Sequence, residues 1–339
     1  MTTTAPSITT TAADLVALLA CPACHGDLDG IKGLSRAAAL RCRVCGACYP
    51  VRDGIPILLP PSTVDAATHD ELDHLHSAGH KRAQSAYYDR AVAEEFEVER
   101  PHGAPALYRW LLEEKFRRSI DGLPPLAGRT VVDVCSGSGM DAEFLARAGA
   151  RVLAIDISEG CVRRARLRAR RRNLRYLAVV GDVERLPLRD AAVDIAYVHD
   201  GLHHLAEPLA GVREMARVAR QAVSITEPAD AAVTKLAVRL GLALAREDAG
   251  NQVARLRAAD VASVLAAAGF DARARRYAMY YRHAPGTVMR ALSSPALLPA
   301  ARLALRAGDA TIGRAGNKLV VTARRVPIPQ YPRSFSSAG

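Results

Sequence analysis

Three acidic residues lie at the ends of three consecutive predicted strands, and the turn after the first strand contains two glycines. Asp133 lies in an apolar strand that runs into a turn containing Gly137 and Gly139. Asp156 ends the next strand, and Asp182 follows the third. Glycines let a ligand approach the backbone and the N-terminus of the following helix, and an acid at a second strand end suits ribose hydroxyls. Three carboxylates at neighbouring strand ends favour a positively charged nucleoside ligand.

The same residues also satisfy a second pattern. Gly137, Gly139 and Ala142, with Asp156 about twenty residues further on, fit the dinucleotide-binding fingerprint of dehydrogenases. Asp133 argues against that alternative, because its carboxylate would repel a pyrophosphate but attract an ammonium group. Asp182 adds a third acid, suited to an adenine amino group.

Histidines follow the fourth predicted strand, in the segment His199-Asp-Gly-Leu-His203-His204. A hydroxyl nucleophile needs a group that accepts its proton, and histidine is the commonest such base. His203 and His204 are therefore the candidate catalytic residues. The alternative interpretation is that one of them caps the following helix or packs on the sheet.

Two C-x-x-C pairs, Cys21/Cys24 and Cys42/Cys45, are separated by seventeen residues. This is the spacing of a four-thiolate zinc site, which leaves no open coordination position and is therefore structural. A segment this short has too little core to fold alone, and metal binding would supply the missing free energy. Cys48 forms a third C-x-x-C with Cys45, so the spacing leaves open whether Cys48 replaces Cys42 or Cys45.

The order of elements predicts an α/β protein with a parallel sheet, because short apolar runs alternate with amphipathic stretches from residue 130 onward. Expected strands are 130–134, 151–155, 175–180, 193–199, 222–227, 271–280 and 317–324. Expected helices are 140–149, 158–172, 209–219 and 254–268, with a helical insertion around 286–308. Helical patterning also covers 84–120, broken near Pro101 and Pro105.

The chain has 339 residues and a formal net charge of +11. That balance suits nucleic acid or an anionic membrane surface, but only five of the 46 basic residues are lysine, a skew equally explained by GC-rich codons. No apolar run reaches the ~18 residues of a membrane span. Residues 1–20 carry no Lys or Arg, and the cysteine spacing is metal-like, so we expect a cytoplasmic protein.

The motifs in VVDVCSGSGMDAEFLARAGARVLAIDIS and GDVERLPLRDAAVDIAYVHDGLHHLAEP resemble class I S-adenosylmethionine (SAM) methyltransferases of the small-molecule type, over about 130–280. The resemblance implies a Rossmann-like sheet of strand order 3-2-1-4-5-7-6 with the last strand antiparallel. It also implies that SAM is the cofactor. The implied cofactor-binding residues are Asp133, Ser136, Gly137 and Gly139 toward the methionine part, Asp156 and Ile157 toward the ribose, Asp182 and Val183 toward the adenine, and His199 beside the methyl group.

A separate resemblance covers the N-terminal segment. CPAC…CRVCGACYPVRDGIPILL is similar to the small zinc-knuckle proteins that activate tRNA and protein methyltransferases. We therefore expect a zinc-knuckle module at 14–60, a linker and helical lid at 61–125 and a SAM-dependent methyltransferase domain at 126–325. The resemblance also suggests that Tyr87 and Tyr88 lie on the lid helix.

Several polar segments have alternative roles. Glu227, His283 and the segment 247–251 are further pocket candidates, whereas the arginines of 163–175 are interpreted as a solvated helix face. The histidines at 69–80 are interpreted as part of a solvated linker rather than a metal site.

These observations favour a SAM-dependent methyltransferase that acts on a small-molecule acceptor: a natural product, a lipid or a sugar-containing metabolite. The alternative is an rRNA or tRNA base methyltransferase, supported by the basic charge and the zinc module but lacking an N/D-P-P-Y/F motif and aromatic residues interleaved with basic ones. A third hypothesis is a non-enzymatic scaffold, disfavoured by the intact acids. The sequence leaves open the acceptor, the methylated atom and the oligomeric state.

Overall fold

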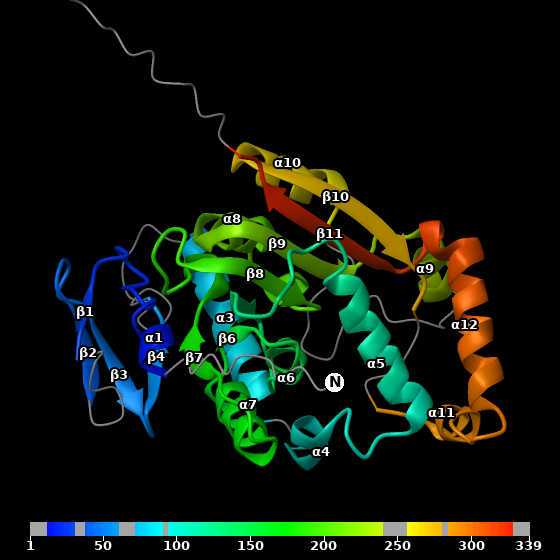
Figure 1. Cartoon of the computed structure of the whole chain (residues 1–339). Helices are drawn as coiled ribbons and strands as arrows, with labels where there is room; N and C mark the ends of the chain where they lie inside the picture. The colour runs from blue at the N-terminus through cyan, green and yellow to red at the C-terminus, as the bar shows by residue number, and fades with distance from the viewer. Residues whose placement is uncertain are drawn as a thin grey trace, which may run out of the picture.

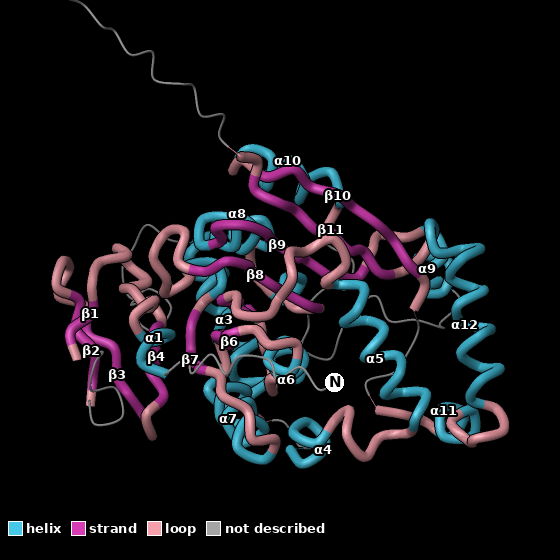
Figure 2. Tube along the Cα trace, viewed as in Figure 1, coloured by secondary structure: helices cyan, strands magenta, loops and turns pink. Residues whose placement is uncertain are grey.

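A computed structural model describes residues 12–30, 38–60, 72–90, 94–239, 256–279 and 284–327 (Figures 1 and 2). Its strands are β1 (Leu28–Asp29), β2 (Ala39–Cys42), β3 (Cys48–Arg52), β4 (Ile55–Leu58), β5 (Thr130–Val134), β6 (Arg151–Asp156), β7 (Leu177–Gly181), β8 (Val193–His199), β9 (Ala219–Pro228), β10 (Phe270–Tyr277) and β11 (Lys318–Arg325). Its α-helices are α1 (Ala12–Val16), α3 (Leu72–Asp89), α4 (Glu94–Glu99), α5 (Ala106–Ser119), α6 (Met140–Arg147), α7 (Glu159–Arg171), α8 (Pro208–Val218), α9 (Ala232–Arg239), α10 (Ala258–Ala267), α11 (Thr287–Leu292) and α12 (Leu298–Ile312). Short 3-10 helices are η2 (Val183–Arg185), η3 (Leu202–His204) and η4 (Gly313–Ala315).

The strands form one continuous sheet within the described residues, in the order β1-β2-β3-β4-β7-β6-β5-β8-β9-β11-β10. Counted from β5 as the first strand, the part from β7 to β10 has the order 3-2-1-4-5-7-6. Strand β11 is antiparallel to both of its neighbours, β9 and β10. This is the arrangement that the resemblance implies, and each expected strand from 130 onward lies within a few residues of its observed position.

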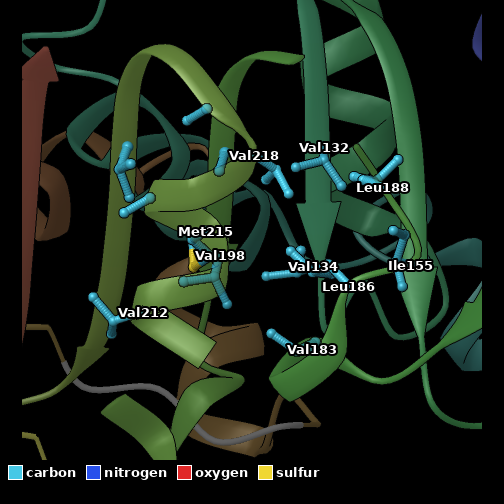
Figure 3. Close-up of a cluster of buried hydrophobic side chains, with 14 of the residues drawn as sticks. Val132, Val134, Ile155, Val183, Leu186, Leu188, Val198, Val212, Met215 and Val218 are labelled. Atoms are coloured by element: carbon cyan, nitrogen blue, oxygen red, sulfur yellow. The ribbon is translucent and has the colours of Figure 1, made fainter. Parts of the chain in front are cut away.

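Alternating apolar side chains of the central strands fill two cores, one on each face of the sheet. Val132 and Val134 pack on the face covered by α8, against Val212 and Met215 (Figure 3). Val131 points to the opposite face, which is covered by α5, α6 and α7. Because both faces are covered, the parallel strands end in a row at one edge, where βα loops can gather polar side chains.

The N-terminal segment joins this sheet rather than standing apart from it. Strand β4 pairs in parallel with β7, with Ile57 opposite Val180 and Leu58 opposite Gly181. Leu19 and Leu40 are fully buried in the same core as the central strands. The sequence did not reveal this junction, because nothing local in β4 specifies its partner.

Helices outside the central sheet come from two places in the chain. Before β5, helices α3, α4 and α5 occupy the region expected to be linker and lid, with the break between α4 and α5 at the expected prolines. Between β10 and β11, α11 and α12 form the expected insertion. Helix α9 was not predicted. In the described ranges, none of the helices is long and apolar enough to cross a membrane.

Candidate functional site

The turn after β5 has a backbone that only glycine accommodates easily. Gly137 and Gly139 have φ values of 52° and 76°, and Cys135 has a φ of 52°. A Cβ added at Gly139 would lie 2.7 Å from the Tyr176 hydroxyl and 2.9 Å from the Ala165 Cβ. The second glycine is therefore required for helix α6 to begin close against α7.

Asp156 fixes this turn from the end of β6. One carboxylate oxygen accepts a hydrogen bond from the Gly137 amide at 2.9 Å, and the other accepts from the Ser158 amide at 2.9 Å. Burial raises the pKa of Asp156, and these two amides partly oppose that increase. Each oxygen keeps a second lone pair, so the carboxylate can still accept hydroxyl donors from a ligand.

Asp133 is a buried acid that lacks a full set of partners. Its side chain is 1% exposed, and Oδ2 has no hydrogen-bond partner among the described residues. Burial, together with the negative charges of Asp141 and Asp156, raises the pKa of Asp133 well above its usual value. A buried, unsatisfied carboxyl is costly, and a cationic donor placed beside it would remove that cost. Ser136 Oγ is likewise buried without a hydrogen-bond partner in the described part of the chain.

Asp182 caps the turn after β7 and is tied to helix α3. Its Oδ1 accepts from the Glu184 amide at 2.9 Å, and Oδ2 lies 2.7 Å from the Lys81 ammonium. Lys81 also pairs with Glu184 at 2.6 Å. Val183 is buried in the core beneath this turn. The predicted adenine-side acid is thus shared with a lysine that sequence reasoning missed.

Helix α3 crosses the ends of the central strands. Its last residue, Asp89, accepts from Ser158 Oγ and the Gly160 amide, both at 2.7 Å. Ser85 Oγ donates to the Ile157 carbonyl at 3.3 Å. These contacts place α3 directly over the loops that carry Asp156 and Asp182. Tyr87 is exposed on this helix; His69 and the side chains of His74 and His76 lie outside the described residues.

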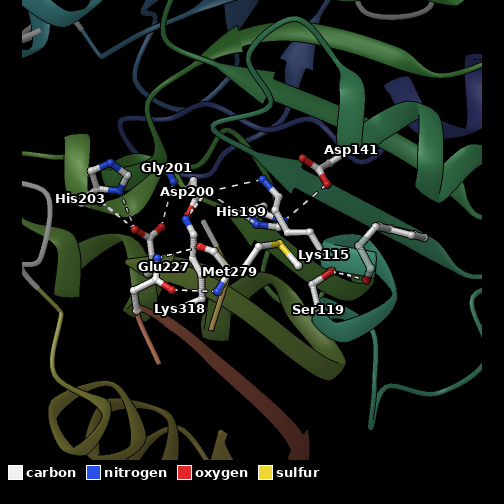
Figure 4. Close-up of polar contacts among 12 residues, drawn as sticks. Lys115, Ser119, Asp141, His199, Asp200, Gly201, His203, Glu227, Met279 and Lys318 are labelled. Carbon is white, nitrogen blue, oxygen red and sulfur yellow. Dashed lines mark hydrogen bonds and ion pairs between the residues drawn. The ribbon is translucent and has the colours of Figure 1, made fainter. Parts of the chain in front are cut away.

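His199 belongs to a buried polar cluster at the end of β8 (Figure 4). Its Nδ1 lies 3.6 Å from Asp141 and 3.3 Å from the Tyr197 hydroxyl. Burial and the nearby Lys115 lower the pKa of His199. Burial alone would raise the pKa of Asp141, but His199 and Lys115 bring it below the ordinary value.

Asp200, the next residue, is held between two lysines. Lys318 Nζ lies 2.6 Å from both carboxylate oxygens, and Lys115 Nζ lies 3.4 Å from one of them. Burial opposes ionisation, but the two lysines hold the pKa of Asp200 well below its usual value. Lys318 begins β11 and Lys115 lies on α5, so this cluster joins three distant segments of the chain.

His203 forms a buried dyad with Glu227 from the end of β9. The His203 Nδ1 and Glu227 Oε2 atoms are 2.6 Å apart. The other Glu227 oxygen accepts from the Gly201 and Leu202 amides at 2.9 and 2.7 Å. The carboxylate therefore fixes both the loop and the orientation of the imidazole ring. Sequence reasoning had named both residues without pairing them.

His204 lies on the outer side of the dyad, beneath α3. Its ring centroid is 4.2 Å from that of His203 and 5.5 Å from that of Tyr88. Its Nδ1 lies 3.2 Å from Gln84 Oε1, and its carbonyl is 2.7 Å from His80 Nε2. The structure thus brings both predicted histidines to the same edge of the sheet as the three acids. His283 and the segment 247–251 lie outside the described residues.

Most arginines of 163–175 are exposed or half-buried, but the prediction of a solvated face was wrong for Arg164 and Arg168. Arg168 is fully buried; it donates to the Ser138 carbonyl at 2.9 Å and pairs with Glu143 at 3.0 Å. Arg164 donates to Ser138 Oγ at 3.2 Å and to the Tyr88 carbonyl at 2.6 Å. Both arginines brace the glycine turn, because they share the inward stripe of α7 with Cys161.

The four paired cysteines converge in the N-terminal segment. The Sγ atoms of Cys21, Cys24, Cys42 and Cys45 all lie within 4.8 Å of one another. The Val44 and Cys45 amides point at Cys42 Sγ at 3.4 and 3.5 Å, as in a knuckle that stabilises thiolates. Cys48 is exposed and lies outside this group.

Two family models match the chain. Residues 132–225 match a family described as "Methyltransferase domain", and residues 13–54 match one described as "Trm112p-like protein". A demethylmenaquinone methyltransferase of Beutenbergia cavernae is 36% identical over 104 residues, which are 31% of this chain and 42% of that protein. An uncharacterized 37.1 kDa protein in transposon TN4556 of Streptomyces fradiae is 36% identical over 105 residues, 30% of each chain. The chain thus spans about two fifths, or less, of the length of these curated relatives.

Solved structures confirm the fold. The [4+2]-cyclase SpnF has a TM-score of 0.50 and 20% identity, over 73% of this chain and 97% of that chain. Magnesium protoporphyrin IX methyltransferase from Synechocystis, with bound SAH, has a TM-score of 0.50 and 17% identity, over 73% of this chain and 100% of that chain. The protein therefore has the class I SAM methyltransferase fold. It joins that fold to an N-terminal Trm112-like module in one chain.

Proposed function

We propose that this protein transfers the methyl group of SAM to a small-molecule acceptor. The observation that carries the proposal is the buried Asp133 carboxyl, whose Oδ2 has no hydrogen-bond partner among the described residues, beside the glycine turn. A fold alone does not settle chemistry, and one structural neighbour is a [4+2]-cyclase. The residues around the turn, however, have the charges that SAM requires.

We propose a partner in SAM for each of these residues. Asp133 would pair with the amino group of the methionine part, with Ser136 and the Gly137 and Gly139 backbone alongside. Asp156 would accept hydrogen bonds from the ribose hydroxyls next to Ile157. SAM would supply an electrophilic methyl group on a sulfonium.

The adenine end has a competing cation. Asp182 and the Val183 amide would hold the adenine, while Lys81 shares the Asp182 carboxylate at 2.7 Å. Lys81 also neutralises Glu184, so α3 can stay closed over the nucleoside without leaving two acids unpaired.

The His203–Glu227 dyad is the proposed general base. Glu227 holds Nδ1 at 2.6 Å, which would fix the proton on Nδ1 and leave Nε2 as the basic nitrogen. Glu227 would also stabilise the imidazolium formed when the acceptor loses its proton. His204, whose ring is tilted against that of His203 and hydrogen-bonded to Gln84 of α3, would position the dyad and contact the acceptor. His199, whose pKa is lowered by burial, would line the methyl side of the pocket.

Among small molecules, the proposed acceptor is a lipophilic one. The curated relatives include demethylmenaquinone methyltransferases of several bacteria, which are named for a quinone acceptor. A phenolic hydroxyl or an activated ring carbon of such a molecule would need the base that His203 offers.

For the cysteine group we propose a structural zinc site. Four sulfur atoms this close fit a tetrahedral ion with Zn–S distances of about 2.3 Å. Zinc would hold the N-terminal segment folded against β7 and so act on the site through that strand.

A second candidate function, methylation of a tRNA or rRNA base, is favoured by the match of residues 13–54 to Trm112p-like proteins. In this chain, however, β4, which comes directly after residues 13–54, pairs with the chain's own β7. That pairing gives the module a role within the protein and does not require RNA.

The test uses the zinc-loaded full chain and SAM labelled in its methyl group. The protein is incubated separately with an organic-soluble metabolite extract and with total RNA, and label is followed into each. We expect label in the organic fraction and its loss with His203→Asn. Label in RNA alone would establish the second candidate, and label in neither fraction would contradict methyl transfer.

A further inference from the structure

The insertion between β10 and β11 exposes apolar side chains to solvent in unusual concentration. Among the described residues, eight large hydrophobic side chains are exposed. Five of them belong to this insertion: Val288, Leu297, Leu303, Leu305 and Ile312. Val288 is 71% exposed and Leu303 is 69% exposed. Scattered apolar residues are ordinary on a protein surface, but a cluster indicates an interaction site.

The charged side chains of helix α12 contact neighbouring elements. Arg302 and Arg306 lie over the Trp110 ring of α5, at 5.7 and 5.5 Å from its centroid. Asp309 pairs with Arg118 at 2.5 Å and accepts from the Ala278 amide at 2.8 Å. No other charged residue occurs in the helix. Apart from Arg306, the exposed residues of the helix are uncharged: Pro299, Ala300, Leu303, Ala304, Leu305, Ala307, Ala310, Thr311 and Ile312.

The border of this face is basic. In the described stretch 284–316 the basic residues are Arg290, Arg302, Arg306 and Arg314, and the acid is Asp309, which is occupied by Arg118. The solvent side of the insertion thus combines leucine, isoleucine and valine with arginine and carries no acid within those residues. An apolar face bordered by cations is the pattern of helices that lie in a membrane interface.

We propose that the α11–α12 insertion docks on an anionic lipid surface. Apolar side chains such as Leu303 would enter the acyl boundary, while the bordering arginines would contact lipid phosphates. Insertion of a few apolar side chains binds a membrane only weakly, and so does attraction between surface charges. Stable binding requires both together. This inference does not depend on the proposed methyl transfer.

Two other occupants fit the surface less well. A second copy of the chain would bring the two basic borders together, and their like charges would repel. RNA would neutralise the arginines but leave Leu303 and Val288 in water, with no apolar partner. The position of the insertion suits a flat support: Figure 1 shows α11 and α12 at the end of the molecule opposite β1–β3.

The experiment is a vesicle flotation assay with the full, zinc-loaded chain. It uses vesicles of phosphatidylcholine alone and of phosphatidylcholine mixed with phosphatidylglycerol. We expect binding to the mixed vesicles, weakening as salt rises, and little binding to phosphatidylcholine alone. Leu303→Asp should lower the partition coefficient about tenfold or more, and Arg314→Gln about fivefold, near the ~1 kcal/mol expected for a basic residue close to an anionic surface.

Matched substitutions control for general effects. Val326 is 52% exposed at the far end of β11, so Val326→Asp should bind as the unmodified chain does; Arg213→Gln, on exposed α8 surface, is the charge control. An unchanged melting temperature of Leu303→Asp excludes misfolding. Absence of binding to mixed vesicles, or equal loss with Val326→Asp, would overturn the proposal. Concentration-dependent dimers that Leu303→Asp dissolves would assign the face to a second copy and also overturn it.

Discussion

The two halves of the candidate site are built in different ways. The half at the ends of β5, β6 and β7 relies mainly on nearby backbone amides, which fix Asp156 through Gly137 and Ser158; its one described side-chain tie to a remote segment among the three acids is the pairing of Asp182 with Lys81. The half at the ends of β8 and β9 uses side chains fixed by other side chains from remote segments. His203 is held by Glu227, and Asp200 is held by Lys115 and Lys318.

This difference has a functional consequence. The first half can keep its shape as long as the sheet is intact. This suits the binding of SAM, because the methyl donor stays the same whatever the acceptor is. The second half changes if any one of several distant elements changes, which suits a site adapted to one acceptor. Substitutions in the two halves should therefore separate donor binding from methyl transfer.

The largest effect is expected from His203→Asn. Loss of a general base typically costs about 10²- to 10⁴-fold in rate, and SAM binding should remain within about twofold because the donor half is untouched. Single-turnover methyl transfer and calorimetry with SAM measure the two quantities. Glu227→Gln should reproduce much of the loss. A normal rate in both variants would remove the dyad from the mechanism.

Arg168→Met should destabilise the protein by about 3 kcal/mol, since it leaves the buried Glu143 without one of its charged partners. Urea unfolding measures this loss. Arg170→Met, on the exposed side of the same helix, is the matched control and should change stability by about 0.5 kcal/mol at most. Equal stability of the two variants would show that Arg168 does not brace the glycine turn.

SAM affinity should rise with pH because of Asp133. Burial raises the pKa of this carboxyl in the free protein, and a bound ammonium group would lower it, so binding releases a proton. Affinity then increases as pH rises between the lower, bound-state pKa and the higher, free-state pKa, and levels off above the latter. Calorimetry in buffers of different ionisation enthalpy measures the released proton, and Asp133→Asn should abolish the dependence. A pH-independent affinity in the unmodified chain would contradict this assignment.

The smallest effect on the site is expected from Cys24→Ser. Loss of zinc should lower the melting temperature and weaken SAM binding only a few-fold, through the pairing of β4 with β7. Metal analysis and calorimetry test this, with Cys48→Ser as the control because Cys48 lies outside the sulfur group. Full zinc content in Cys24→Ser, or zinc loss in Cys48→Ser, would refute the ligand set.

The first half of the site could be predicted from the sequence more completely than the second. Asp133, Asp156 and Asp182 could be placed because each lies at or next to the end of a strand that is recognisable locally. Lys115 and Lys318 could not, since their contacts with Asp200 span 85 and 118 residues of sequence. The pairing of β4 with β7 was missed for the same reason.

The wrong prediction for Arg164 and Arg168 could have been avoided from the sequence. Arg164 and Arg168 lie three and seven residues after Cys161, at the spacing of an inward helical stripe. Their charge suggested solvent, but the carbonyl of Ser138 and the carboxylate of Glu143 provide buried partners for Arg168. A buried cation is tolerated where hydrogen-bond acceptors already surround it. Here those acceptors come from the turn and from α6.

The most direct test of the account is calorimetric titration of SAM into the unmodified chain and into Asp156→Asn. We expect saturable binding at one site per chain and an affinity about tenfold to a hundredfold lower in the variant, because a charged acceptor of ligand hydroxyls is lost. Absence of SAM binding by the unmodified chain, or equal affinity in the two proteins, would contradict it.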